Sequence, residues 1–167
     1  MVAAEPNPWR REAAAALGIH AIVPDDLERM VAAETNGAGV PVVIEVSGNP
    51  AALAAALPLL AHEGTALVAS WYGLRPVTSP LGGEFHRRRL TIRSTQVRTI
   101  PARLAGTWTR DRRRATARRL LDELPVQALA THVFPFDEAA AAYAVVDRGE
   151  PRLLHAAFDY RSLSGSG

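Results

Sequence analysis

The stretch VVIEVSGNP, residues 42–50, decides the fold together with the alanine- and leucine-rich run 51–60 that follows it. Its first five residues carry no turn signal and are rich in β-branched side chains, which predicts a strand buried on both faces. Gly48 ends that strand. Asn49 can then cap a helix with Pro50 in its first turn, and leucines recur at three- to four-residue spacing along the run. The stretch therefore predicts a strand that leads directly into an amphipathic helix.

A second strand is predicted at residues 65–69, after the turn His62-Glu63-Gly64. A strand, a helix and a strand joined by short links form a right-handed crossover onto a parallel sheet. Open sheets of this kind bind ligands at the carboxyl ends of their strands. In this unit those ends are residues 46–48 and 69–71, so both segments are candidates for a binding site.

The chain before this unit shows the same alternation of strands and helices. A strand at 2–4 is followed by a helix at 9–17 that stops at Gly18, and a strand at 19–23 is followed by an aspartate-capped helix at 27–34. Repeated alternation of this kind predicts an α/β fold with a doubly wound parallel sheet.

The second half of the chain has a weaker pattern. It predicts a short edge strand, a further strand, two helices and a closing strand, at residues 76–78, 90–94, 100–123, 139–146 and 153–158. Residues 161–167 have the composition of a linker and are expected to be a disordered tail. With 167 residues, 48% of them hydrophobic, the chain can bury one core and is expected to form a single domain.

The composition excludes several classes of site. The chain has no cysteine, which excludes disulfides and thiolate-ligated metals, and its five histidines show no metal-ligand spacing. It has no apolar run long enough to span a membrane and no basic region followed by a hydrophobic one at its start. A cytoplasmic location without membrane partners is therefore expected.

An arginine cluster raises the alternative of a nucleic-acid binder. All 19 basic residues of the chain are arginine. Six of them cluster at residues 110–119 of one predicted helix: Arg110, Arg112, Arg113, Arg114, Arg118 and Arg119. Such a cluster could neutralise phosphates, but its members point around the helix and no aromatic residues interleave with them for base stacking. A solvated helix is the favoured interpretation, and a nucleic-acid partner is not expected.

Four segments carry a family resemblance. They are VAAEPNPWRREAAAALGIHAIVP from residue 2, VVIEVSGNPAALAAALPLLAHEGTALVAS from residue 42, EFHRRRLTIRSTQ from residue 84 and THVFPFDEAAAAY from residue 131. In this order and at this spacing they resemble the C-terminal, nucleotide-binding half of the medium-chain dehydrogenase/reductase superfamily, which includes zinc alcohol, polyol and threonine dehydrogenases. The resemblance implies an incomplete Rossmann-like doubly wound sheet over residues 1–160, beginning at the second strand.

The departures from that superfamily limit the expected activity. In the superfamily the first strand leads through a G-x-G-x-x-G turn into a helix whose N-terminus holds the pyrophosphate. This chain shows neither that turn nor the catalytic domain with its zinc ligands. The expectation is a truncated NAD(P)-dependent alcohol dehydrogenase-like oxidoreductase, inactive alone or needing a complementary half. Binding of NAD or NADP by the isolated chain is expected to be weak or absent, and no zinc is expected.

The resemblance assigns cofactor contacts to ten positions and a catalytic role to none. Glu5 matches an acidic residue that binds ribose hydroxyls and favours NAD, and Arg10 matches a basic residue beside the adenosine ribose. Arg11 could instead accept a 2′-phosphate, which leaves NADP open. The remaining positions follow three strands and would border the adenine, its ribose and the nicotinamide: Ser47, Gly48, Ala69, Ser70, Trp71, Ser94, Thr95 and Gln96.

Self-association is a further expectation from the resemblance. Superfamily dimers commonly join the edges of two nucleotide-binding domains, and residues 74–78 with 90–94 resemble that edge. The chain is therefore expected to form a homodimer through a sheet edge or to pair with a separately encoded N-terminal half. A Val77→Lys change is expected to weaken the dimer with little effect on the fold. A non-catalytic self-associating or partner-binding module is the alternative to an enzyme.

Overall fold

The structure is a computed structural model that describes residues 1–161. It consists of two compact units: unit 1 holds residues 1–24 and 103 onward, and unit 2 holds residues 25–102. All strand pairs of the described chain are parallel, which confirms the predicted α/β class with parallel strands. The strands form three separate hydrogen-bonded sheets, and each unit is described by itself below.

Unit 2 is built on a parallel sheet of three strands. They are, in their order across the sheet, β3 (Val40–Glu45), β4 (Leu60–Val68) and β5 (Thr91–Ser94). After β3, Asn49 caps helix α3 (Pro50–Ala56) by accepting a 3.0 Å hydrogen bond from the Ala51 amide, as predicted. The predicted helix 51–60 is too long, because Pro58 cannot donate a helical hydrogen bond and the chain tightens into the 3-10 turn η2 (Leu57–Leu59). The predicted unit of strand, helix and parallel strand is confirmed.

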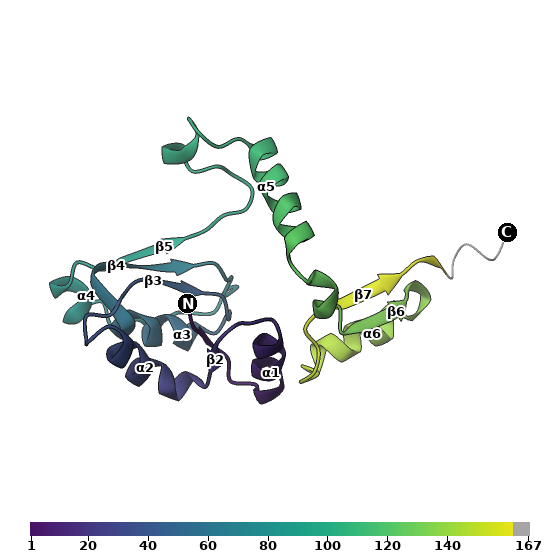
Figure 1. Ribbon diagram of the computed structural model, residues 1–167, viewed down its shortest axis with the longest axis horizontal. Helices are drawn as coiled ribbons and strands as arrows, with labels where there is room; N and C mark the ends of the chain where they lie inside the picture. The colour runs from purple at the N-terminus through teal and green to yellow at the C-terminus, as the bar shows by residue number, and fades with distance from the viewer. Residues whose placement is uncertain (162–167) are drawn as a thin grey trace. The chain divides into compact units, whose positions relative to one another are not determined.

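The other helices of unit 2 are short. Helix α2 (Leu27–Glu34) follows the 3-10 turn η1 (Pro24–Asp26), and α4 (Glu84–Arg87) is a single turn that the sequence did not predict. The expected aspartate cap of α2 is absent, because the Asp26 carboxylate pairs with Arg29 at 2.6 Å. Figure 1 shows α2 and α3 on the same side of the β3-β4-β5 sheet.

The core of unit 2 lies between α3 and this side of the sheet. Its buried members are aliphatic: Leu53, Leu57, Leu60, Ala66 and Leu90. Leu60 is 0% exposed and is the largest side chain that is fully buried in the described chain. Half-buried side chains from β3, β4, β5 and the connecting segments pack around this cluster, so the hydrophobic spacing of α3 is explained by its contact with the sheet.

Two predictions for unit 2 are wrong. Strand β3 is not buried on both faces: it lies at the edge of the sheet, and the side chains of Val42 and Ile44 are 50% and 57% exposed. Residues 76–78 do not form an edge strand but belong to a loop. Val77 from this loop packs against the core. A Val77→Lys change is therefore expected to destabilise the fold, contrary to the prediction from the sequence.

Strand β4 contains an irregularity where the sequence predicted a turn. Between the pairs Val40↔Leu60 and Val42↔Thr65, β3 advances two residues while β4 advances five. Glu63 adopts φ 59° inside this bulge, and its amide donates a 2.8 Å hydrogen bond to the carbonyl of Arg88. Residues 62–64 therefore do depart from regular strand geometry, as predicted. They form a bulge within β4 instead of a turn between a helix and a new strand.

Unit 1 contains two parallel pairs of strands. The first pair is β1 (Ala3–Ala4) with β2 (Ala21–Ile22), and the second is β6 (His132–Pro135) with β7 (Ala156–Asp159). Helix α1 (Pro8–Ala16) lies between β1 and β2 in sequence, and α6 (Ala139–Asp147) lies between β6 and β7 after the 3-10 turn η5 (Phe136–Glu138). The sequence did not predict β6, and it placed the closing strand at 153–158, earlier than observed.

Contacts between distant segments hold unit 1 together. The Asn7 side chain caps α1 by accepting from the Arg10 amide at 3.2 Å, and it donates to the carbonyl of Pro151 at 2.7 Å. Gly18 follows α1 with φ 74°, as the predicted C-terminal stop requires. Residues 162–167, most of the tail expected to be disordered, lie outside the described residues.

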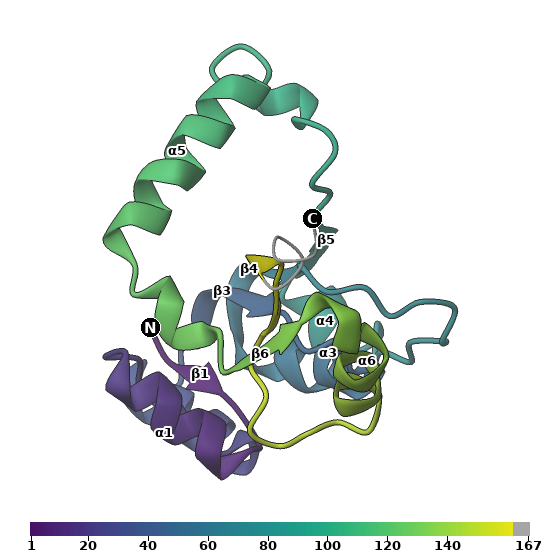
Figure 2. The same cartoon turned by 90° about the vertical axis from the view of Figure 1, so that its right-hand side faces the viewer.

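Helix α5 (Arg110–Glu123) is shorter than the predicted helix 100–123. Thr109 begins it by accepting a 3.1 Å hydrogen bond from the Arg112 amide, and the preceding segment forms only the 3-10 turn η3 (Ala102–Leu104), which follows Pro101. No residue of α5 is buried, and Figure 2 shows its course between η3 and the 3-10 turn η4 (Val126–Leu129). No helix in the described part of the chain is both long and apolar enough to cross a membrane.

Candidate functional site

Eight of the ten predicted cofactor residues follow the three strands of unit 2. The parallel pairs Glu45↔Val68 and Val68↔Ser94 place the carboxyl ends of β3, β4 and β5 at the same edge of the sheet. The segments that leave this edge hold the predicted residues: Ser47 and Gly48, then Ala69, Ser70 and Trp71, then Ser94, Thr95 and Gln96. We call this edge, with residues 45–48, 69–72 and 94–96, the strand-end site. The structure brings these residues together, and their role in cofactor binding stays a prediction.

The centre of the strand-end site is a buried carboxylate. The side chain of Glu45, the last residue of β3, is 4% exposed. Its Oε1 accepts hydrogen bonds from the Ser47 amide at 2.6 Å and from the Ser47 hydroxyl at 2.5 Å. Its Oε2 accepts from the Ser70 hydroxyl and, at 2.6 Å, from the Tyr72 hydroxyl. One side chain therefore links the segment after β3 to the segment after β4.

These donors determine the charge of Glu45. Burial alone would raise the pKa of its carboxyl group, but the hydrogen bonds from Ser47, Ser70 and Tyr72 outweigh burial and lower the pKa from 4.5 to about 2. Burial and the hydrogen bond to Glu45 raise the pKa of the Tyr72 hydroxyl. Glu45 is thus a carboxylate, and Tyr72 a neutral hydroxyl donor, throughout the physiological pH range.

The same two segments meet at a second place, on the surface. Arg75 donates from Nη2 to the carbonyl of Gly48 at 2.6 Å and from Nε to the carbonyl of Tyr72 at 3.1 Å. Gly48 adopts φ 68°, where a side chain would be strained, and a Cβ built on it would lie 3.7 Å from the carbonyl oxygen of Trp71. The backbone conformation of Gly48, rather than a clash with Trp71, therefore favours glycine at this position.

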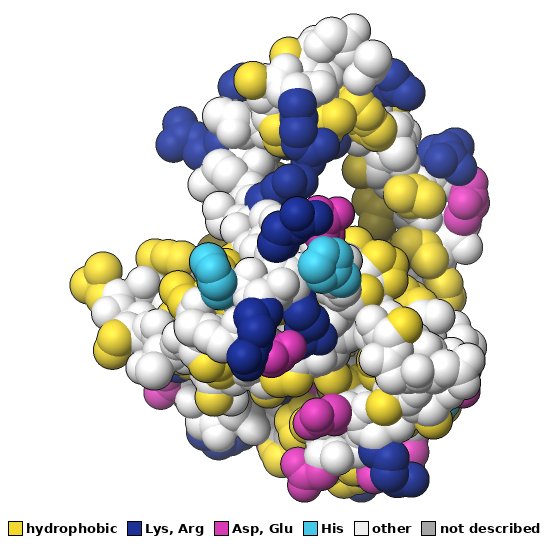
Figure 3. Space-filling model, turned by 90° about the vertical axis from the view of Figure 1, so that its left-hand side faces the viewer, with side chains coloured by type: hydrophobic (Ala, Val, Ile, Leu, Met, Phe, Trp, Pro, Cys, Tyr) yellow, Lys and Arg dark blue, Asp and Glu magenta, His cyan; other side chains and the backbone are white. Residues whose placement is uncertain are grey.

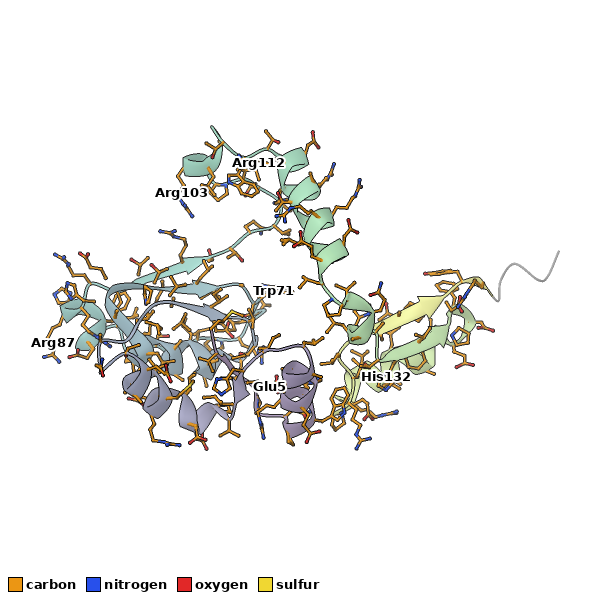
Figure 4. All side chains as sticks on the ribbon, viewed as in Figure 1. Glu5, Trp71, Arg87, Arg103, Arg112 and His132 are labelled. Carbon is orange, nitrogen blue, oxygen red and sulfur yellow. The ribbon has the colours of Figure 1, made fainter. Side chains whose placement is uncertain are left out.

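The outer part of the strand-end site is open to solvent. Trp71 is 84% exposed, and Figure 4 labels its side chain beyond the end of β4. Ser94, Thr95 and Gln96 are also exposed. An exposed indole beside hydroxyl and amide groups offers a planar ligand an aromatic face and hydrogen-bonding partners.

The two remaining predicted residues, Glu5 and Arg10, belong to unit 1. Glu5 follows β1, and its Oε1 accepts a 2.8 Å hydrogen bond from the Asn7 amide (Figure 4). Arg10 donates from Nη2 to the carbonyl of Leu153 at 3.1 Å. Arg11, the alternative phosphate ligand, donates to the backbone carbonyl of Glu5 at 2.8 Å. All three side chains thus have local partners that stabilise the turn before α1 and its link to the C-terminal segment.

The residues present do not fit a zinc ion. Within residues 1–161, no three histidine, aspartate or glutamate side chains lie close enough together to hold a metal. The Glu45 carboxylate has four hydrogen-bond donors from protein groups and no acidic or histidine neighbour among its partners. We therefore assign no metal chemistry to the described chain.

Arginines form two groups with local partners. On α5, Arg112 lies over the ring of Trp108 at 4.6 Å, and Arg119 pairs with Glu123 at 2.8 Å. Around α4, Arg87 pairs with Glu84 at 2.8 Å, on the face of unit 2 that Figure 3 shows with arginine and histidine side chains beside each other. These exposed pairs favour solvated helices, the interpretation given above for α5.

Two residues of the strand-end site, Glu45 and Tyr72, were not predicted from the sequence. Glu45 was included in a strand expected to be buried on both faces, where an acidic side chain is a conspicuous exception. The serine two residues later was a further signal, because a short hydroxyl side chain at this spacing can return a hydrogen bond. Tyr72 follows Trp71 in a segment without a periodic pattern, so no local signal identified it.

Comparisons with known proteins agree with this geometry. A family model described as zinc-binding dehydrogenase matches residues 1–120. The L-threonine 3-dehydrogenase of Bacillus subtilis (strain 168) is 28% identical over 153 residues, which cover 90% of this chain and 42% of that protein. The chain thus spans less than half the length of this curated relative.

Two solved structures show the same fold. The 2R,3R-butanediol dehydrogenase from Bacillus subtilis matches with a TM-score of 0.71 at 20% identity, over 94% of this chain and 42% of that chain. A short chain alcohol dehydrogenase (rspB) from Escherichia coli CFT073, solved in complex with NADH, matches with a TM-score of 0.69 at 16% identity, over 93% of this chain and 43% of that chain. At these identities the likeness supports the partial Rossmann-like arrangement of the strands.

Proposed function

Since the chain belongs to the zinc-binding dehydrogenase family, we propose that its strand-end site is the part of an NAD(P) site that faces the adenosine and the nicotinamide. We propose that this site contributes to the activity of an alcohol dehydrogenase-like oxidoreductase. The observation that carries the proposal is the meeting of three parallel strand ends at one edge, around the Glu45 carboxylate. Ligands of open α/β sheets bind at this edge.

Each of the three segments has a binding role. Backbone groups of residues 47–48 border the adenine and its ribose, and those of residues 69–71 and 94–96 border the nicotinamide. When bound, NAD(P) supplies the hydride-transfer chemistry, and the protein supplies binding and orientation. NADH bound to the Escherichia coli structure supports a nicotinamide cofactor. No catalytic residue is assigned, so we propose that these 167 residues alone do not oxidise alcohols and act only with a complementary half.

For unit 1, taken by itself, we propose that Glu5 favours NAD over NADP. A carboxylate beside the adenosine ribose can accept hydrogen bonds from both hydroxyls and would repel a 2′-phosphate. Its Oε1 already accepts from the Asn7 amide, which fixes the carboxylate and leaves Oε2 for a ribose hydroxyl. Arg11 favours NADP only if its guanidinium leaves the carbonyls of Glu5 and Pro6.

Binding of the free cofactor to this chain is expected to be weak. The sequence contains no G-x-G-x-x-G turn to hold the pyrophosphate. Ribose contacts contribute only about 1–3 kcal/mol each, which is compatible with a dissociation constant weaker than about 1 mM. Isothermal titration calorimetry with NAD and NADP measures this constant, and a micromolar value would refute the expectation of weak binding. NAD-dependent alcohol oxidation at a normal turnover rate by the purified chain would refute the need for a complementary half.

A second candidate function, self-association, is favoured by the free edge of β3. Among the described residues, β3 has only β4 as a paired neighbour. Val42 and Ile44 expose their side chains along it, and Val46 does so just after its end. An apolar strand with an unpaired edge is a template for pairing with a second chain. The interface expected at residues 74–78 with 90–94 stays a prediction. Residues 76–78 form a loop, whereas β5 (Thr91–Ser94) lies at the other edge of the sheet and has β4 as its paired neighbour among the described residues.

Light scattering at about 100 μM protein tests this candidate, because mass action favours association at high concentration. An Ile44→Lys variant should yield monomers if β3 is the interface. The matched control is Leu74→Lys, at a fully exposed loop position in the segment where the sequence predicted the interface. A monodisperse monomer of the unaltered chain would exclude self-association, and dissociation by Leu74→Lys alone would move the interface to the loop.

A further inference from the structure

We infer that Glu45 is a positioning residue: its carboxylate holds the segments after β3 and β4 in one arrangement and thereby presents their backbone to a bound dinucleotide. This inference rests on the proposed function of the strand-end site. It concerns a residue that touches no ligand in that proposal but holds the residues that do.

The four hydrogen bonds of Glu45 are divided between the two segments. Oε1 receives both donors of Ser47, in the segment after β3, and Oε2 receives the hydroxyls of Ser70 and Tyr72, in the segment after β4. A carboxylate has about four acceptor sites, so none is left for a ligand. Glu45 can therefore act on a ligand only through Ser47, Ser70 and Tyr72.

Other contacts join the same two segments. Arg75 bridges the carbonyls of Gly48 and Tyr72. The amide of Ala69 also donates to the carbonyl of Glu45 at 2.8 Å. The carboxylate is thus the buried centre of a small, fully connected network, and such networks fix one arrangement of the groups that they include.

A fixed arrangement strengthens binding because the free protein does not have to order its loops when the ligand arrives. Replacing Glu45 by glutamine keeps the shape of the side chain but turns one acceptor into a donor, which faces the hydroxyls of Ser70 and Tyr72. We expect this change to loosen both segments and to weaken NAD binding about tenfold, the usual scale of one ordering step.

The experiment is nuclear magnetic resonance of the full, nitrogen-15-labelled chain, first without ligand and then with NAD up to about 20 mM, well above a millimolar dissociation constant. In the unaltered protein, the Ser47 amide proton should resonate far downfield and exchange slowly. In Glu45→Gln it should move upfield, and signals of residues 47–48 and 70–72 should broaden while residues 65–68 of β4 keep their shifts. Glu28→Gln, an exposed glutamate of α2, is the matched control and should change none of these signals.

Each outcome decides the inference. Unchanged signals of both segments in Glu45→Gln would overturn it, and so would loosened segments with an NAD dissociation constant within twofold of the unaltered value. If NAD shifts no signal of the strand-end site in the unaltered protein, the proposed function fails, while the ligand-free spectra still show whether Glu45 holds the two segments. Should Glu45→Gln fail to fold, Ser70→Ala removes a single donor, and a shift of the Ser47 amide across the network is then the expected result.

Discussion

Replacing Glu45 by glutamine should destabilise unit 2 at neutral pH by about 3 kcal/mol. The hydrogen bonds of Ser47, Ser70 and Tyr72 lower the pKa of the carboxyl group from 4.5 to about 2. Each unit of pKa difference between the folded and unfolded states corresponds to about 1.4 kcal/mol, which gives the expected figure. Because Glu45 is only 4% exposed, solvent screens these hydrogen bonds little.

The sign of the pH dependence follows from the lowered pKa. The unfolded chain binds a proton at Glu45 near pH 4.5, whereas the folded chain does so only near pH 2. The stabilisation is therefore complete above pH 4.5 and is lost as the pH falls towards about 2. By pH 3 about 2 kcal/mol of it should be gone, so the difference between the unaltered protein and Glu45→Gln should shrink to about 1 kcal/mol.

Urea unfolding followed by far-ultraviolet circular dichroism, at pH 7 and pH 3, measures this difference. The comparison between the two proteins is essential, because Arg161 also lowers the pKa of Asp159 to about 2 and Asp159 titrates in both. Glu28→Gln should unfold like the unaltered protein at both pH values. A difference for Glu45→Gln that is the same at pH 7 and pH 3 would refute the role given to the charged carboxylate.

Three further substitutions test the packing of unit 2, each by urea unfolding. Leu60→Ala removes a side chain that is 0% exposed and should cost about 3 kcal/mol; a loss below about 1 kcal/mol would mean that the core collapses around the cavity. Gly39→Ala should cost about 2 kcal/mol, because Gly39 has φ 78° and a Cβ would lie 2.7 Å from the carbonyl carbon of Leu60; an unchanged midpoint would contradict that close approach. Val77→Lys should cost about 2 kcal/mol, because this half-buried valine packs on the core, whereas the exposed Leu74→Lys should cost almost nothing; equal effects would remove Val77 from the core.

The sequence predicted the parts of the fold that depend on local chemistry. Asn49 and Pro50 begin α3 as expected, and Gly18 follows α1 with a positive φ. The position of the strand-end site was also predictable, because parallel strands that are paired along their length have their carboxyl ends at the same edge of the sheet. The segments holding Ser47, Ser70 and Ser94 therefore lie together because of the parallel sheet that the alternation of strands and helices predicts.

The parts that the sequence did not predict depend on distant contacts. Glu45 is buried because it lies on the face of β3 that the core covers. Both faces of β3 carry β-branched residues, so the sequence did not show which face is buried and which is exposed. Val77 lies in a loop and packs on the core of unit 2. From the sequence alone, a buried loop valine cannot be told from a strand residue, which is why an edge strand was predicted here. The helix expected at 100–123 began too early because helical propensity alone did not identify Thr109 as its cap.

The bulge of β4 has a consequence for how the length of this chain can vary. Elsewhere in β4, inserting or deleting one residue would turn every later side chain to the opposite face of the sheet. The pairs Thr65↔Thr91 to Val68↔Ser94 begin only after the bulge, whose backbone is held by Glu63 and Arg88. A residue gained or lost at positions 61–64 can thus be absorbed in the extra loop without changing the register of β4 with β5. Family members should differ in length here while keeping the same strand ends.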